Sequence, residues 1–506
     1  MARGNALKRT SRAAAPAQKA PDPACAEALQ VVAETRTASS LPLSLTVPAF
    51  NCMYRDMRRL VARGIRVPAG MVGDVGSLAQ RFQRLQSLRL EDEYISDEAV
   101  AQLAALTSLT RLDLICCSMS IPGATLLSAL TGLRALNIDG TDAAVELWPA
   151  LPSLARLSAR GTALGPEGAA QLAAAGHARL EDLRLRSAMP GTAGCARLAA
   201  LRRLTALHMQ DCDLADAHLA PALSLLPELV ELDVSHNREL TAAALQPLTR
   251  ARSLRRLNLS RCPSLAADWD SLVSLADLDQ LRELDISHTW LLGDEVAELA
   301  AGLTGLERLS VAGYSLAEAV GSALGQLPRL QALDARGCRL DTNIAWVVRL
   351  TGLTSLALGA SDNLGADAAA HIATLTGLLE LDVCRAALDW QGARHLATLT
   401  RLTSLAIAGN DLRPKGVRQL HKLLSLQALD VTHVRATSRD ISGLSRLTGL
   451  TCLQARFCER RGPAARRAAR PAGPCPDDSP APCRPAVWAE LAGRRGDARP
   501  GLSDPA

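Results

Sequence analysis

Leucines recur along this chain in a fixed spacing, Leu-x-x-Leu-x-Leu, in which polar residues alternate with the last two leucines. The pattern occurs sixteen times between Leu85 and Leu450, and the first leucines of successive copies lie 24.3 residues apart on average. Alternation with a period of two predicts a short strand whose leucines point to one side. A repeat of this length predicts a solenoid in which each repeat contacts only its neighbours.

The segment after most of these strands carries an apolar helical face. Val100, Leu103 and Leu106 illustrate the spacing, which predicts one helix per repeat. Strands stack at roughly 4.8 Å whereas packed helices need roughly 8–10 Å, so such a stack must curve with its sheet on the inside. The sequence therefore predicts an α/β solenoid (horseshoe) with a parallel concave sheet and a helical convex face.

Small polar residues occupy one position after the strand in most repeats. We expect this position to bond the backbone as the chain turns, which gives a ladder of such bonds along the stack. Its occupants are Cys117, Cys212, Cys262, Cys338, Cys458, Asn237, Asn410, Thr141, Thr162 and Thr289. Five of the 13 cysteines thus have a structural role, and the number is odd with no CxxC pair, which excludes a disulfide framework and a zinc site.

Composition divides the chain into four predicted segments. Residues 1–22 are a basic leader, for which a transit peptide, a secretion leader and plain disorder remain open. Residues 23–80 are predicted to be a small helical N-terminal cap, residues 81–458 hold the repeats, and residues 459–506 form an Arg/Pro/Ala-rich tail predicted to be disordered. No apolar run is long enough to span a membrane.

The formal net charge of +5 belongs to the two end segments, since residues 1–22 carry +4 and residues 459–506 carry +3. The central repeats are slightly acidic, so we expect no nucleic-acid partner. No nucleotide-binding, hydrolase or metalloprotease motif occurs, and we predict a monomer that is not an enzyme, with no catalytic residue, no cofactor and no metal.

Aspartate recurs at the middle position of the predicted strands, facing the concave side by the period-two rule. One interpretation is a binding stripe for a basic partner surface, and the other is a solvated acid that keeps the sheet soluble. Three histidines lie beside this column. The predicted partner-binding residues are Asp113, Asp233, Asp285, Asp334, Asp382, Asp430, His208, His236 and His288. The rare aromatic residues Trp269, Trp290 and Tyr314 follow neighbouring strands and are either contact hot spots or loop packing.

The repeat pattern is that of the leucine-rich-repeat superfamily. The outer segments Gly168–Ala173 and Gly392–Ala397 also resemble the GAxALA motif of the GALA family, although the fourth position is Gln or His here. GALA proteins are type III effectors of plant-pathogenic bacteria that join an F-box to leucine-rich repeats. Residues 41–61 look like a shortened F-box, with adaptor-binding positions at Leu41, Pro42, Leu45, Phe50, Met57 and Leu60.

These resemblances imply a substrate receptor. The F-box-like segment would dock on the adaptor of an SCF-type cullin–RING ubiquitin ligase, and the concave face would hold a host protein. The chain would be secreted by a bacterial type III system into the host cytoplasm, or would stay in the bacterial cytoplasm if it is not secreted. The alternative is a plain interaction scaffold whose residues 23–80 are only a cap. A third hypothesis, an inhibitor that occludes an enzyme with its concave face, follows from the fold alone.

Overall fold

The computed structural model describes residues 64–67, 85–91, 94–141, 151–162, 164–175, 177–316, 318–340, 344–361 and 364–456. The chain divides into two compact units, residues 1–143 and residues 144–506. Each unit consists of parallel strands backed by helices. Among the described residues, no helix is long and apolar enough to cross a membrane.

The described part of the first unit contains a sheet of four parallel strands in the order β1-β2-β4-β6. They are β1 (Gly64–Val67), β2 (Ser87–Glu91), β4 (Arg111–Ile115) and β6 (Ala135–Asn137). A small outer pair joins β3 (Tyr94–Ile95) to β5 (Ser118–Met119), and the helices are α4 (Asp97–Ala104), α5 (Ile121–Leu126) and η3 (Leu127–Ala129). In α4, the Ser96 side chain accepts a hydrogen bond from the Ala99 N–H, so it caps the helix.

Strand β1 lies inside residues 23–80, which the sequence assigns to a helical cap. It pairs with β2 in the same register as every later neighbour, with Ile65 opposite Leu88. The sheet therefore begins before residue 81. The rest of that segment, including Leu41, Pro42, Leu45, Phe50, Met57 and Leu60, lies outside the described residues, as do residues 1–22 and 459–506.

Among the described residues of the second unit, thirteen strands form a parallel sheet and follow one another in chain order. They are β7 (Arg156–Ser158), β8 (Asp182–Arg184), β9 (Ala206–His208), β10 (Glu231–Asp233), β11 (Arg256–Asn258), β12 (Glu283–Asp285), β13 (Arg308–Ser310), β15 (Ala332–Asp334), β17 (Ser355–Ala357), β18 (Glu380–Asp382), β19 (Ser404–Ala406), β20 (Ala428–Asp430) and β21 (Cys452–Gln454). An outer pair joins β14 (Ser315–Leu316) to β16 (Arg339–Leu340).

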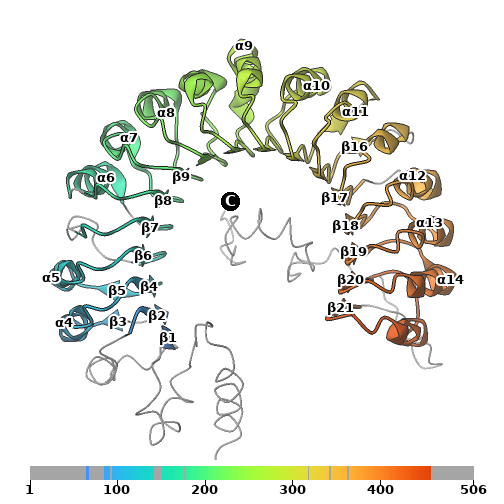
Figure 1. Cartoon of the computed structure of the whole chain (residues 1–506), viewed down its shortest axis with the longest axis horizontal. Coiled ribbons are helices and arrows are strands. Elements are labelled where there is room, and N and C mark those ends of the chain that lie inside the picture. The colour runs from blue at the N-terminus through green and yellow to red at the C-terminus, as the bar shows by residue number, and fades with distance from the viewer. Residues whose placement is uncertain are drawn as a thin grey trace, which may run out of the picture. The chain divides into compact units, whose positions relative to one another are not determined.

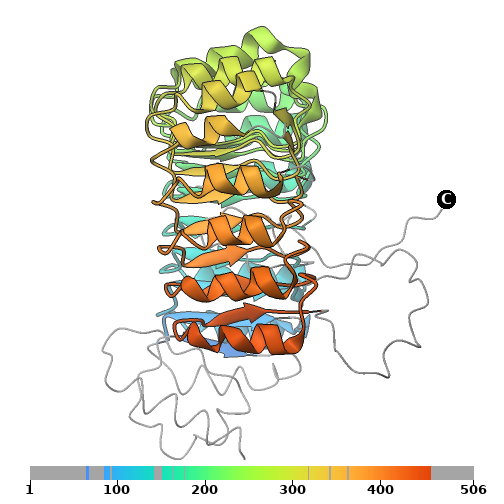
Figure 2. The same ribbon diagram turned by 90° about the vertical axis from the view of Figure 1, so that its right-hand side faces the viewer.

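Helices cover the outer side of this sheet, and the strands line its inner side (Figure 1). Figure 2 shows the later helices one above another across the outer wall. The α-helices are α6 (Gly165–Ala174), α7 (Gly191–Leu198), α8 (Asp216–Leu223), α9 (Trp269–Val273), α10 (Gly293–Gly302), α11 (Glu318–Leu324), α12 (Gly365–Ile372), α13 (Trp390–Leu396), α14 (Arg413–Val417) and α15 (Ser438–Ser442). The 3₁₀ helices are η4 (Ala242–Arg250), η5 (Pro263–Ala267), η6 (Ser274–Asp277), η7 (Ala345–Arg349), η8 (Arg418–Lys422) and η9 (Gly443–Arg446).

The central leucine of each strand stands opposite the central leucine of the next, as Leu232, Leu257 and Leu284 do. These leucines are at most 4% exposed from β7 to β20, because helix side chains cover them from the other side. Close packing of one aliphatic layer needs no aromatic residues. The α/β leucine-rich-repeat solenoid that the sequence predicts is confirmed.

The predicted ladder after the strands is confirmed where the structure describes it. The Asn410 amide donates to the carbonyl oxygens of Val383 and Ile407, both at 2.8 Å, and its Oδ1 accepts the Ala386 and Leu388 N–H groups, both at 3.0 Å. Asn237 makes the same set of bonds to its neighbouring repeat. One buried side chain thus joins the backbones of two successive repeats.

Cysteine replaces asparagine in other repeats and makes a subset of these bonds. The thiols of Cys212, Cys262 and Cys338 donate to carbonyl groups of the preceding repeat. Burial raises the pKa of Cys212 and Cys338 to about 11 and that of Cys262 to about 12. These thiols are therefore structural donors with almost no thiolate at neutral pH.

We expect iodoacetamide at pH 8 to spare these three thiols in the folded protein. The exposed Cys116 should react at least about tenfold faster, because alkylation needs an accessible thiolate. Peptide mass spectrometry of briefly labelled protein measures the difference, and urea should abolish it. Equal labelling of Cys116 and Cys262 before denaturation would contradict the assignment.

Candidate protein-binding face

Two columns of side chains cross the inner face of the sheet in the second unit, with one residue per strand in each column. The residue of the first column precedes the central leucine, and the residue of the second column follows it. We call these the first and second columns. The aspartates of this unit that the sequence predicts as partner-binding residues all belong to the second column.

Aspartate alternates with another residue along the second column. Asp233, Asp285, Asp334, Asp382 and Asp430 occupy β10, β12, β15, β18 and β20, and the strands between them carry Asn258, Ser310, Ala357 and Ala406. This alternation separates like charges by two strand spacings, roughly 10 Å, which limits their repulsion. In the first unit, Asp113 occupies the equivalent position on β4.

These aspartates are not solvated. Each is at most 8% exposed, and each second-unit carboxylate accepts the N–H of the residue two positions later. The distances are 3.0 Å from Ser235 to Asp233, 3.0 Å from Ser287 to Asp285 and 3.1 Å from Arg336 to Asp334. Cys384 and Thr432 bond Asp382 and Asp430 in the same way. The column closes the ends of the strands, a role that the period-two pattern does not reveal.

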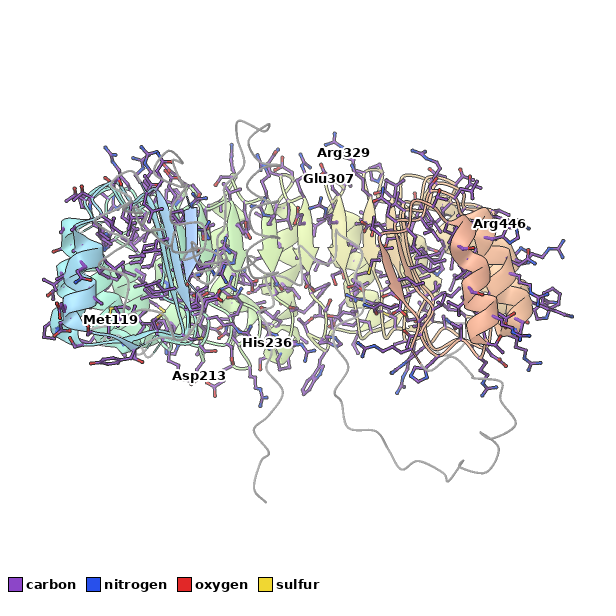
Figure 3. The ribbon with its side chains drawn as sticks, turned by 90° about the horizontal axis from the view of Figure 1, so that it is seen from below. Met119, Asp213, His236, Glu307, Arg329 and Arg446 are labelled. Atoms are coloured by element: carbon purple, nitrogen blue, oxygen red, sulfur yellow. The ribbon has the colours of Figure 1, made fainter. Side chains whose placement is uncertain are left out.

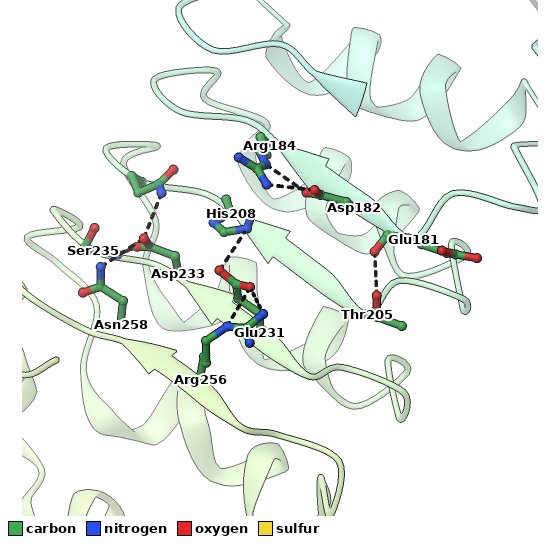
Figure 4. A network of polar contacts seen from close by, with 11 residues as sticks. Glu181, Asp182, Arg184, Thr205, His208, Glu231, Asp233, Ser235, Arg256 and Asn258 are labelled. Carbon is green, nitrogen blue, oxygen red and sulfur yellow. Dashed lines mark hydrogen bonds and ion pairs between the residues drawn. The ribbon is translucent and has the colours of Figure 1, made fainter. Parts of the chain in front are cut away.

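The first column alternates in charge over four strands. It runs Glu231, Arg256, Glu283 and Arg308, and Arg308 contacts Glu283 at 2.7 Å while the Arg256 Nε donates to Glu231 at 2.9 Å. His208, 1% exposed, places its Nε2 3.5 Å from Glu231 (Figure 4). Each guanidinium is thus neutralised by the carboxylate of the preceding strand.

Side chains of β10 to β13 enclose a hollow on this face. Its charged and polar lining consists of Glu231, Asp233, Arg256, Asn258, Glu283, Asp285, Arg308 and Ser310. Among the described residues, no group of three or more His, Cys, Asp or Glu side chains could hold a metal ion. The arrangement presents an ordered array of alternating charges, which suits recognition of a complementary polar surface.

His236 and His288 do not lie on this inner face. They belong to the turns that follow β10 and β12, at the edge of the sheet, whereas His208 lies within the charged array. Figure 3 shows His236 and Asp213 on this edge, with Glu307 and Arg329 on the opposite one. The sequence predicts that these histidines lie beside the aspartates on the inner face. In the structure they lie in the turns at the edge of the sheet.

The Asp233 carboxylate accepts hydrogen bonds from three donors, but its burial away from water disfavours the charged form. Its Oδ1 accepts from Ser235 and its Oδ2 accepts from Gln210 and Asn258, yet burial raises the pKa of its carboxyl group above the ordinary value. The Gln210 Oε1 is buried without a partner among the described residues.

We therefore expect Asp233→Asn, which buries no charge, to be more stable than the wild type at pH 7. A raised carboxyl pKa means that wild-type stability increases as the pH falls through the folded-state pKa toward the unfolded one. The advantage of the variant should consequently vanish near pH 3. Urea unfolding at both pH values measures this, and a destabilised variant at pH 7 would show that the charged form is required.

Comparisons with known proteins show similarity of fold only. No protein-family model matches the chain, and no curated protein matches it. An internalin from Listeria monocytogenes aligns over 78% of this chain and 96% of its own length, at 17% identity and a TM-score of 0.42. A leucine-rich-repeat protein from Leptospira interrogans aligns over 83% of this chain and 98% of its own, at 15% identity and a TM-score of 0.38. TLR13, solved in complex with ssRNA13, aligns over 79% of this chain and 58% of its own, at 18% identity and a TM-score of 0.40.

Proposed function

We propose that this chain is a protein-binding module whose inner sheet face, centred on β10 to β13, holds a protein partner. The carrying observation is the hollow lined by Glu231, Arg256, Glu283 and Arg308 in alternating order. Its side chains are fixed by ion pairs and come from rigid strands in register. Preorganised charges of this kind favour specificity, because a partner with mismatched charges loses several kcal/mol.

Charge reversal on this face tests the proposal. Arg256→Glu with Arg308→Glu converts the alternating column into four consecutive acids, whereas Arg349→Glu alters an exposed residue of the outer wall. Proteins captured from plant cells by the full chain should be lost by the double variant and kept by the control, with both variants folded by circular dichroism. Retention by the double variant would reject the inner face as the binding surface.

We further propose that the partner is a host protein recruited to an SCF-type ubiquitin ligase. The support is the resemblance of residues 41–61 to an F-box and of the outer helices to the GALA family. Under this proposal the chain acts as a secreted effector in the host cytoplasm. A plain scaffold with a structural cap remains the alternative function, and it requires target binding without any adaptor.

A pull-down with purified plant adaptor separates these two functions. The full chain should bind the adaptor, and Leu41→Ala with Pro42→Ala should abolish binding, while Arg349→Glu should not change it. If the full chain does not bind, the ubiquitin-ligase role fails and the scaffold function remains. The inner-face experiment is unaffected by either result.

A further inference from the structure

A second hollow lies on the edge of the second unit, in the turns after strands β9 to β12. Its lining is Asp211, His236, Arg238, Arg261, Pro263, His288 and Trp290. These residues come from the turns of four successive repeats. The hollow is distinct from the charged array of the inner face, with which it shares no residue.

The backbone along this edge has a left-handed conformation that is unfavourable for residues other than glycine. Asp211, His236, Arg261 and His288 occupy the same turn position, with left-handed φ values of 56°, 64°, 60° and 59°. Each donates its N–H to a carbonyl of the next repeat, so the conformation is required. Residues other than glycine adopt this left-handed conformation only at an energetic cost.

Glycine fills this turn position in several other repeats. Examples are Gly140, Gly161, Gly313, Gly337 and Gly409, all with positive φ. Across the described repeats, only this stretch has four successive ionisable side chains at the position. Glycine would adopt this turn without strain, as it does in other repeats. The strained residues therefore point to a role for their side chains.

Positive charge on this edge is available to a partner. On the inner face, arginines are neutralised within the chain, as Arg184 is by Asp182 and Arg336 by Asp334. Arg238 and Arg261 are exposed instead, and neither forms an ion pair with any acid in the described part of the chain. Within the hollow, Asp211 accepts a hydrogen bond from Ser187 of the preceding repeat.

Beside these arginines stands an exposed apolar surface. Trp290 is 77% exposed and Leu292 is 69% exposed, and Trp290 also has a left-handed φ of 62°. Tyr314, on the next repeat, is instead buried with its hydroxyl bonded to the Ile286 carbonyl. Loop packing thus accounts for Tyr314 but not for Trp290.

We propose that this edge binds an acidic peptide segment of the protein partner, with an aromatic or aliphatic residue of that segment against Trp290. The two guanidinium groups match carboxylates in geometry and charge. Tryptophan and arginine are both enriched at the energetic centres of protein interfaces. The inference rests on the proposed protein-binding function and adds a second, positively charged contact surface to the alternating charges of the inner face.

Selection from a random peptide library tests the proposal without knowledge of the partner. Twelve-residue peptides displayed on phage are selected on the full chain, then on Arg238→Glu/Arg261→Glu, on Trp290→Ala and on Arg385→Glu. Arg385 is the matched control, since it is exposed and occupies the same left-handed turn position on the repeat of β18. A single-stranded oligouridine is included as a competitor.

We expect wild-type selection to enrich peptides that combine several Asp or Glu residues with a large apolar residue. Their affinity should fall at least tenfold in the Arg238/Arg261 and Trp290 variants and stay unchanged in the Arg385 variant. No acidic enrichment, an equal loss in the Arg385 variant, or displacement by oligouridine with selectivity for RNA would overturn the inference. Those results would leave the inner-face experiment intact, so the two failures are distinguishable.

Discussion

Asn410→Ala should destabilise the protein by about 3–5 kcal/mol. The substitution removes five hydrogen bonds of the Asn410 side chain. It leaves the Ala386 and Leu388 N–H groups and the Val383 carbonyl inside the stack without this partner. Each buried backbone group left without a partner costs about 1–3 kcal/mol, less what relaxation recovers. Urea unfolding followed by circular dichroism gives the total.

Asn410→Thr is the matched control, because threonine holds this position at Thr141 and there bonds the carbonyl of Leu114. We expect it to cost about half as much as alanine, since it keeps a donor. Hydrogen exchange at Ala386 and Leu388 should accelerate in the alanine variant before exchange elsewhere. If the alanine variant loses less than about 1 kcal/mol of unfolding free energy, water molecules replace the hydrogen bonds of Asn410.

Leu381→Ala should cost about 3–5 kcal/mol, whereas Leu453→Ala should cost less than about 1 kcal/mol. Both are central leucines of the repeat motif, but Leu381 is fully buried on β18 and Leu453, on β21, is 46% exposed. The sequence pattern is the same, so only stacking against neighbours distinguishes them.

Unfolding of the Leu381 variant is expected to separate into two transitions, because a weakened repeat uncouples its neighbours in a linear array. Calorimetry and circular dichroism at matched urea concentrations detect this loss of cooperativity. Similar losses in the two leucine variants would contradict the packing of the second unit.

The strands, the buried leucines and the ladder could be predicted from the sequence because each follows from one local period. Strand β1 could not, since Gly64–Val67 lacks the leucine motif and is defined by its pairing with β2. The role of the aspartates also escaped prediction. Period two places Asp233 on a face, but its bond to Ser235 depends on how the strand ends.

The edge hollow could have been predicted by comparing the residues at the same turn position in successive repeats. The residue before the ladder position is glycine at Gly313 and Gly409 but His236, Arg261 and His288 in the stretch that forms the hollow. The sequence could not predict that Trp290 is exposed and Tyr314 is buried. Both follow a strand closely, and the conformation of the turn decides which side chain enters the core.

Site-specific photo-crosslinking tests the central claim most directly. A benzoylphenylalanine is placed at Asn258 on the inner face, which leaves the four alternating charges intact, or at Glu298 on the exposed side of α10. Each variant is irradiated in plant cells that express the full chain. We predict a discrete protein adduct from position 258 and none from position 298. An adduct from position 298 alone, or none from position 258 when a partner still co-purifies, would contradict binding by the inner face.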